Sequence, residues 1–532
     1  MKSRQLLILC FWAAGIFTVF ANKTIYVAPA ASGTGSGIDA ANPCTFPTAL
    51  GNLDATGYTT LVLPNATLFQ LSGGTNGYGR IPVVDNSKII IEGNNSILEG
   101  NGGETRILRA STGCVVELKN LTFRLGNAAA SLGGAIFFGG DSLKIAGCVF
   151  ESNTADNGAA IGSRGKYIKI TNSWFKDNYL RSSFQGGAIS HTGTTSGGKL
   201  IIENTTFSNN NGKAANAAYG TAIITAFDGN VRNYLSEISI TNCTFYKNNS
   251  GLNTHVGDAA IQLDFLGTTA PVGTATTATF VNNTFYGNQN CAINVKGKQQ
   301  ALSLINNAIV GDSWANVSTT GVQDHGIICE YSVAEGRPAL VAKNNYIVAK
   351  FPKSTKTDDA ALASGNADNN ILITTASQND IDALGLSTSL STSGSVVPYL
   401  SVSSSSSPLV EGGVNAVSGI AMFSTDTRGV VRASGTTGSK YDIGAYEFEN
   451  LTTAVQGVST DSFTFNQSIG EVSVINSNNR ILTVTVYLPN GQSVYTKTTN
   501  GTLTINKTQL PKGVLVCIVN DGGKSVAKKI IN

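Results

Sequence analysis

The chain has 532 residues, a formal net charge of +3, 59 glycines and a charged fraction of only 13%. That fraction is about half of the usual value for soluble proteins, and the length allows more than one domain. This composition is typical of a loop-rich extracellular β protein and disfavours a cytosolic enzyme. The small net charge gives no indication of nucleic-acid binding, because nucleic-acid-binding domains are usually strongly basic.

Residues 1–21 have the layout of a secretory signal peptide. A short basic start precedes the apolar run Leu6–Phe20, and Val19 and Ala21 occupy the −3 and −1 positions of a cleavage site. The run is short for a membrane anchor. We therefore expect a secreted protein that does not span a membrane once the signal has been removed.

Residues 22–80 are predicted to form an N-terminal cap. They contain a strand at Ile25–Val27, a short helical piece near Thr48–Leu53 and a second strand at Leu61–Leu63. A solenoid needs such a cover, because the open end of its first coil exposes apolar side chains and unpaired strand groups. The arrangement looks like the N-terminal cap of many bacterial β-helix proteins.

A repeated frame runs through residues 81–350, and its clearest copy is Lys166–Ile189. Alternating apolar residues are followed by a corner at Asn172, an aromatic pair, a second corner at Asn178 and the motif Gly-Gly-Ala-Ile. Each strand is too short to bury its side chains unless it stacks on the equivalent strands of neighbouring coils. The repeat therefore predicts an all-β fold, a parallel β-helix.

Three rows of residues recur at fixed positions of the frame. The large apolar row should form a continuous interior stack, and it comprises Phe123, Phe150, Phe175, Phe207, Phe245, Phe285, Ile309 and Ile347. Three residues earlier stand corner asparagines, which tolerate left-handed dihedrals: Asn120, Asn172, Asn204, Asn242, Asn282, Asn306 and Asn344, with Gly147 breaking the row. Their side chains could hydrogen-bond to one another along the axis. Three residues after the aromatic stand Asn153, Asn178, Asn210, Asn248 and Asn288, and extra length after this row predicts variable loops on one side.

The paired motifs F-x-x-N and G-G-A-[ILV] resemble the repeats of the chlamydial polymorphic outer membrane proteins and related bacterial surface proteins. The resemblance covers roughly residues 114–350 and implies a right-handed β-helix with an adhesin-like role. Two features depart from the pattern. Ile309 and Ile347 replace the aromatic, and the first coil reads FRLGN, one residue too long.

Residues 351–450 are predicted to end the solenoid and cap it. Short turns and strands of opposite charge that could close the far end are SPLVEGG (407–413), DTRGVVR (426–432) and YDIGAYEFE (441–449). They resemble the terminal signature of the choice-of-anchor Q family of bacterial surface proteins.

The charged residues of this signature allow two interpretations. Asp426, Arg432, Asp442 and Glu447 could form a catalytic cluster or a salt-bridged structural cap. We favour the cap, because members of the resembled family share the signature while their solenoids differ.

Residues 455–532 change character. β-Branched strands are punctuated by Asn490-Gly491 and Asp521-Gly522, which are strong hairpin signals and predict a small β-sandwich. The strings NGQSVY and LPKG and the closing KKII resemble the C-terminal sorting domain of Bacteroidetes type IX secretion. Val514-Leu515 stands where that family usually has an aromatic, so a related domain without a sorting role is the alternative.

The three histidines, His191, His255 and His325, do not share one position of the frame, and we expect them to be solvated loop residues. Seven cysteines remain after Cys10 of the signal, without the spacing of a zinc site. Leu9 before Cys10 disfavours a lipoprotein signal. We expect no metal or cofactor and interpret the repeat cysteines as small buried apolar residues.

The densest group of residues able to do acid–base chemistry is His255, Asp258 and Asp264, with Asp228 one coil earlier. Asp258 and Asp264 are separated by an even number of residues and could share a strand face. A glycosidase needs such paired carboxylates, whereas a lyase needs a base beside a group that stabilises an enolate. Asp258 replaces a glycine of the structural motif, so a surface turn is the simpler interpretation.

Two functional hypotheses follow. The first is a secreted cell-surface protein, adhesin-like, that binds glycans or other host or microbial surface ligands. The alternative is a polysaccharide lyase or glycoside hydrolase built on the same solenoid. The fold alone does not distinguish them.

Overall fold

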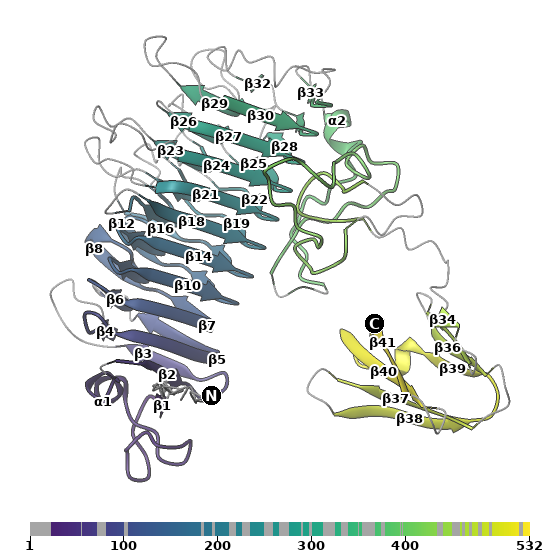
Figure 1. The fold of residues 1–532 in the computed structure, drawn as a ribbon, viewed down its shortest axis with the longest axis horizontal. Coiled ribbons are helices and arrows are strands. Elements are labelled where there is room, and N and C mark those ends of the chain that lie inside the picture. Colours follow the sequence, from purple (N-terminus) through teal and green to yellow (C-terminus); the bar gives the residue numbers. More distant parts are fainter. Residues whose placement is uncertain are drawn as a thin grey trace, which may run out of the picture.

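The structure is a computed structural model, and it describes most of the chain between residues 23 and 532 (Figure 1). The described ranges are 23–54, 56–71, 81–100, 105–181, 186–193, 197–211, 220–225, 235–248, 259–264, 276–288, 291–296, 300–311, 325–330, 339–348, 351–353, 368–373, 378–393, 395, 397–432, 440–448, 458–459, 463–467, 471–476, 481–488, 492–520 and 525–532.

The solenoid is a parallel β-helix, as predicted, and its coils present three main faces (Figure 1). The long-strand face comprises β1 (Lys23–Tyr26), β2 (Tyr58–Val62), the first parts of β5 (Lys88–Gly100) and β7 (Val115–Arg124), β10 (Ser142–Ala146), β14 (Tyr167–Thr171), β18 (Gly198–Glu203), β21 (Leu235–Thr241), β24 (Thr276–Val281), β27 (Gln300–Ile305) and β30 (Ala339–Lys343). The short-strand face follows the left-handed corner of each coil. It comprises β3 (Leu68–Leu71), the last parts of β5 and β7, β11 (Val149–Glu151), β15 (Trp174–Lys176), β19 (Thr206–Ser208), β22 (Thr244–Tyr246), β25 (Thr284–Asn288), β28 (Ala308–Gly311), β31 (Tyr346–Val348) and β33 (Ile371–Ile373).

The third face is a ten-stranded parallel sheet. Its strands are β4 (Ile81–Val83), β6 (Leu108–Ala110), β9 (Ile136–Phe138), β13 (Ile161–Ser163), β17 (Ile189–His191), β20 (Ile223–Ile224), β23 (Ile261–Asp264), β26 (Cys291–Lys296), β29 (His325–Glu330) and β32 (Phe351–Lys353). A small sheet of β8 (Asn127–Leu132), β12 (Thr154–Asn157) and β16 (Tyr179–Leu180) precedes it in the early coils.

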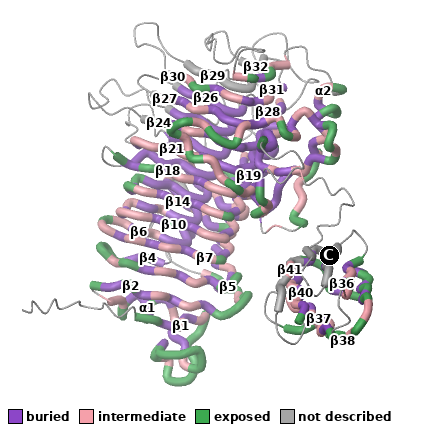
Figure 2. Tube along the Cα trace, turned by 45° about the vertical axis from the view of Figure 1, so that its right-hand side comes forward, coloured by how far each residue is buried: buried purple, intermediate pink, exposed green. Residues whose placement is uncertain are grey.

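The predicted apolar row forms the interior stack. Successive phenylalanine rings from Phe123 to Phe285 lie 4.5 to 5.0 Å apart between centroids and within 10° of parallel. This spacing matches the distance between neighbouring strands of a sheet. Ile309 and Ile347 continue the row and are buried. The aliphatic replacements therefore preserve the stack. Buried residues recur along the strands of every part of the solenoid (Figure 2).

The predicted corner asparagines are confirmed. All seven have a positive φ, from 47° at Asn204 to 55° at Asn282, and Gly147 has 65° at the same corner. Asparagine adopts this left-handed conformation more readily than most residues. Along the axis, Asn242 Nδ2 donates to Asn204 Oδ1 at 3.2 Å, and the amide groups of Asn306 and Asn282 lie 3.3 Å apart.

The second asparagine row corrects the prediction of a corner at Asn178. The left-handed residue is one position earlier, as at Ser152 and Asp177, and Asn178 itself is buried. Its Nδ2 donates to Asn210 Oδ1 at 2.9 Å and to the carbonyl of Phe150 at 3.0 Å. These asparagines therefore form an interior ladder that ties one coil to the next.

A further ladder was not predicted. Asn283, Asn307, Asn345 and Asn370 are joined by amide bonds of 3.0, 2.9 and 2.9 Å. They occupy the position at which earlier coils have Cys148 and Cys243, both buried, as expected for those cysteines. The signal was present in the sequence, because each of these asparagines follows directly on another asparagine.

The N-terminal cap contains the expected strand, helix and strand. β1 pairs in parallel with β2, and α1 (Phe46–Gly51) buries Phe46, Ala49 and Leu50. These side chains join the solenoid core.

Residues 351–450 were expected to close the far end of the solenoid, but the described residues between 378 and 448, which we call the side segment, lie along its side. They begin with α2 (Gln378–Asp382) and continue through turns along the short-strand face, beside β19 to β28 (Figure 1). Their apolar side chains form one cluster with outward-facing residues of that face: Ile381, Leu384, Leu386, Leu400, Val402, Leu409 and Ile443 pack with Tyr246, Ala308, Val310 and Val348. The segment therefore covers the side of several coils.

The C-terminal residues form a sandwich of two four-stranded antiparallel sheets with a core of its own. The strands are β34 (Val458–Ser459), β35 (Phe463–Gln467), β36 (Glu471–Asn476), β37 (Leu482–Tyr487), β38 (Ser493–Thr499), β39 (Leu503–Asn506), β40 (Val514–Asn520) and β41 (Ser525–Ile531), with a 3-10 turn at Lys507–Gln509. β37 pairs with β38, and β40 with β41, as the two hairpin signals predicted.

Candidate functional site

The predicted acid–base cluster falls largely outside the described residues. Asp228, His255 and Asp258 lie there, and Asp264 ends β23 opposite Lys296 of β26, with its side chain outside the described part. The cluster therefore stays a prediction. Within the described ranges, no group of three or more His, Cys, Asp or Glu side chains is arranged to hold a metal ion.

His191 is buried inside the solenoid, so the expectation of a solvated loop residue is wrong for it. It lies two residues after the buried Ile189 on β17, and even spacing on a strand places both side chains on the same face. Its Nδ1 lies 3.1 Å from Ser163 Oγ. Burial lowers the pKa of His191 to about 4, so the ring is neutral at physiological pH. His325 lies in a strand, β29, and His255 lies outside the described residues.

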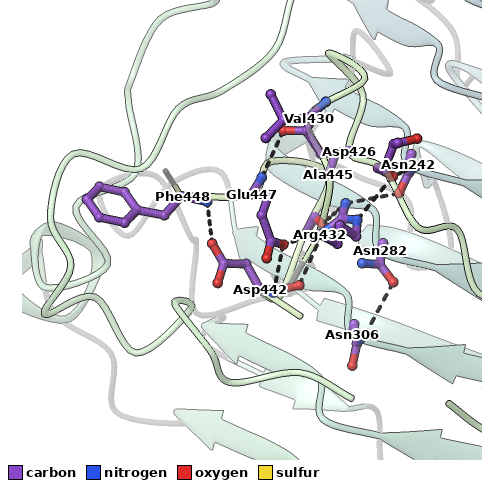
Figure 3. A network of polar contacts seen from close by, with 12 residues as sticks. Asn242, Asn282, Asn306, Asp426, Val430, Arg432, Asp442, Ala445, Glu447 and Phe448 are labelled. Carbon is purple, nitrogen blue, oxygen red and sulfur yellow. Dashed lines mark hydrogen bonds and ion pairs between the residues drawn. The ribbon is translucent and has the colours of Figure 1, made fainter. Parts of the chain in front are cut away.

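The clearest polar constellation surrounds Arg432 in the side segment (Figure 3). Its guanidinium is buried, donates to Glu447 Oε2 at 3.1 Å, and donates to Asn242 Oδ1 and the carbonyl of Gly444 at 3.0 Å each. With its amide oxygen turned toward the guanidinium, Asn282 accepts from Arg432 Nη1 at 2.9 Å. One arginine thus joins the side segment to the corner asparagines of two coils.

Asp426 is the acceptor for a tight turn in the same network. Its carboxylate accepts from the backbone N–H groups of Arg428 at 2.8 Å and Val430 at 3.0 Å, and from that of Glu447 at 3.0 Å. The Arg428 guanidinium pairs with it and lies 3.9 Å from the centre of the Tyr446 ring. Both oxygens of Asp426 are therefore engaged in holding the chain.

Asp442 is the carboxyl group of this network whose pKa is strongly shifted by burial. Burial, with the neighbouring carboxylate of Glu447, raises the pKa of Asp442 to about 7, against the opposing effect of its hydrogen-bond donors and Arg432. Asp442 Oδ1 accepts from the backbone N–H of Glu411 at 2.7 Å, and its other oxygen accepts from that of Phe448. A perturbed carboxyl is often a catalytic signal, but here both oxygens fix the backbone. This geometry supports a structural role for Asp442.

Upstream of the side segment, the short-strand face presents a column of alternating charge on successive coils. Arg124 pairs with Glu99, and Lys176 with Glu151 at 2.8 Å. Beside them lies the half-buried Trp174, whose indole N–H donates to Ser208 Oγ at 2.9 Å while Lys176 lies over its ring. These residues were not singled out as a site from the sequence, because their frame positions look like ordinary solvated strand residues.

The comparisons with known proteins bear on the C-terminal sandwich. Residues 467–532 match the family model described as secretion system C-terminal sorting domain. A search of curated proteins finds no match. The crystal structure of pectate lyase Pel9A matches with a TM-score of 0.36 and 15% identity over 80% of this chain and 97% of that one. The resemblance of residues 407–449 to the choice-of-anchor Q signature stays a prediction.

The sorting-domain match decides where the protein acts. Among the described residues no helix is long and apolar enough to cross a membrane. The C-terminal sandwich corresponds to the predicted type IX sorting domain. The protein is therefore secreted, and it is attached to the cell surface or released outside the cell.

Proposed function

We propose that this secreted protein is an adhesin-like binding protein whose solenoid presents one uncovered face to glycans or other host or microbial surface ligands. The observation that supports this is the division of the short-strand face. The contacts of the described side segment reach the coils from Thr206 onward, whereas Arg124, Glu151 and Trp174 on the earlier coils are partly exposed.

The open part has the chemistry of a recognition surface. Trp174 is held in place by its bond to Ser208, so its ring would lose little conformational entropy on binding. Aromatic residues with a polar handle are enriched at interfaces. The neighbouring charged side chains form ion pairs with one another, Arg124 with Glu99 and Lys176 with Glu151. These pairs hold the charges at fixed positions that a partner could recognise.

The experiment is a binding screen of the full secreted chain on a glycan array and on host-derived surface proteins. Trp174→Ala should weaken a ligand of this face at least about tenfold, a loss typical of an interface aromatic. Tyr167→Ala, which removes a half-buried ring from the long-strand face, is the matched control. A ligand insensitive to Trp174→Ala but lost with Tyr167→Ala would place the binding face elsewhere.

The alternative of a polysaccharide lyase or glycoside hydrolase depends on the group of His255, Asp258, Asp264 and Asp228. It is tested by measuring cleavage of uronic-acid and neutral polysaccharides by the full chain. Activity that is abolished by Asp264→Asn would favour the enzyme over the binding protein.

A further inference from the structure

The corner between the long-strand and short-strand faces binds polypeptide main chain in its covered half. Asn306 donates from Nδ2 to the carbonyl of Val414 at 2.7 Å and accepts from the N–H of the same residue at 2.9 Å. Asn344 donates to the carbonyl of Gly412 at 2.8 Å, and Asn242 to that of Thr425 at 2.8 Å. These partners are backbone atoms, whereas the amide oxygens of Asn242 and Asn282 accept from the Arg432 side chain.

The same corner continues into the uncovered half with the same geometry. Asn120 and Asn172 have φ values of 51° and 49°, against 53° for Asn306 and Asn344, so their side chains leave the corner from an equivalent backbone. Both are exposed. Successive coils are about 4.8 Å apart, as in any parallel sheet. The uncovered coils thus present to solvent the amide groups that hold the side segment downstream.

We infer that the uncovered half of this corner binds an extended polypeptide segment of a partner through its main chain, at Asn172 and Asn120 and beside Trp174. The inference rests on the proposed binding function and specifies the partner. It follows from continuity with the contact already present, because the side segment reaches Thr206, where the carbonyl of Pro398 accepts from the threonine hydroxyl. The next coil upstream carries Trp174.

An extended polypeptide fits this corner better than a sugar does. Asn306 engages the N–H and the carbonyl of one residue simultaneously, which is the pairing between a primary amide and a residue's main chain. From Asn344 to Asn306 the bound chain advances from Gly412 to Val414, two residues for one coil. Asn172 and Asn120 are two coils apart, with Gly147 at the corner between them, so a second chain that advances in the same way would meet them about four residues apart.

The neighbouring side chains define the kind of segment. Glu99, Arg124, Glu151 and Lys176 alternate in charge on successive coils, which disfavours a segment of one charge sign. Trp174, only half-buried, offers apolar contact to one side chain of the partner. The expected partner is an uncharged or mixed-charge extended segment with an apolar residue at one position.

Glycine substitution separates binding from folding at this corner. Gly147 occupies the same corner one coil before Asn172 with φ 65°, so the corner closes without an amide side chain. Asn172→Gly therefore removes the binding group and preserves the left-handed backbone. Asn209→Gly is the matched control, because Asn209 is also exposed and left-handed (φ 52°) but lies at the following corner of the coil.

The test uses the full secreted chain, a displayed library of short random peptides and a glycan array. A selected peptide should bind about tenfold more weakly to Asn172→Gly, the loss expected for one or two hydrogen bonds, and with unchanged affinity to Asn209→Gly. N-methylation of one peptide N–H should weaken binding to the natural chain but not to Asn172→Gly.

Three outcomes would overturn the inference. Peptides unaffected by Asn172→Gly bind elsewhere, so the corner would not be their site. If Asn172→Gly weakens the binding of a glycan but of no peptide, the ligand of this corner is a glycan. The inference would then be wrong, but the proposed binding function would stand. Failure to obtain any peptide or glycan ligand would count against the inference and the proposed function together.

Discussion

The two halves of the short-strand face have the same interior and opposite exteriors. Inside, the phenylalanine stack runs from Phe123 to Phe285 with little change in spacing. Outside, the early coils carry Arg124, Glu151 and Lys176, whereas the later coils carry Ser208, Tyr246 and Val310 at the corresponding positions. The outward residues, and not the repeat motif, therefore show which coils are covered.

The corner asparagines show the same contrast. Asn120 and Asn172 face solvent, while Asn242, Asn306 and Asn344 are buried under the side segment. A buried amide without a partner costs about 1–3 kcal/mol, and the side segment supplies partners to each of the three. One residue type thus serves as a solvated corner in one half and as an attachment point in the other.

The largest loss of stability should come from the interior that both halves share. Phe207→Ala removes a fully buried ring between two stacked neighbours and should destabilise by about 3–5 kcal/mol. Equilibrium urea unfolding measures it. Lys144→Ala, on an exposed long-strand position, is the control and should change stability by no more than about 0.5 kcal/mol. A loss below about 1 kcal/mol for Phe207→Ala would mean that the row is not interior.

A loss of similar size, but confined to the covered half, is expected for Arg432→Ala. The substitution leaves the buried carboxylates of Glu447 and Asp442 without their cation, which typically costs about 3–5 kcal/mol. Limited proteolysis should show the side segment cleaved while the coils around Phe150 stay protected. If the side segment and the coils around Phe150 lose their protection from the protease together, the stabilising role of Arg432 is not confined to the covered half.

The sequence could predict the structural features that recur in every copy of the repeat. The interior Phe row and the left-handed corner at Asn172 follow from spacing and residue type alone. The path of the side segment could not be predicted, because it depends on contacts between residues such as Arg432 and Asn242 that are far apart in the chain. His191 was missed although its even spacing from Ile189 indicated an inward side chain. The candidate Asp264 lies at a strand end whose side-chain surroundings are set by segments far from it in sequence.

Acid titration should distinguish the two halves through groups with opposite pKa shifts. The folded-state pKa of His191 is about 4, below its ordinary 6.5, so its stabilising contribution is complete above pH 6.5 and lost as the pH falls toward 4. The difference corresponds to about 3 kcal/mol. His191→Asn should abolish this part of the acid dependence of the urea midpoint.

Asp442 should act in the opposite direction. Its pKa is raised from 3.8 to about 7, so its contribution is complete below pH 3.8 and lost as the pH rises through 7. Asp442→Asn should therefore flatten the decline in stability of the covered half between pH 4 and 7. An unchanged pH profile in both variants would contradict the buried placement of these groups.

The smallest effect is expected at the uncovered corner. Asn172→Ala forces a residue with a Cβ and no amide into left-handed dihedrals and should cost about 1–2 kcal/mol. Asn172→Gly should cost less, because glycine adopts this conformation readily. Thermal unfolding of the two variants measures the difference. A larger loss for the glycine variant than for the alanine variant would contradict the left-handed backbone at this corner.

The most direct test of the division of the short-strand face is the reactivity of a cysteine placed at the same frame position in each half. Val149→Cys lies in the uncovered half, and Thr244→Cys lies at the equivalent position beneath the side segment. Each variant is labelled with a thiol reagent under native conditions, with the parent chain as the background. The account predicts rapid labelling at 149 and protection at 244 until the side segment is released by unfolding or by Arg432→Ala. Equal labelling rates at the two positions in the folded protein would contradict it.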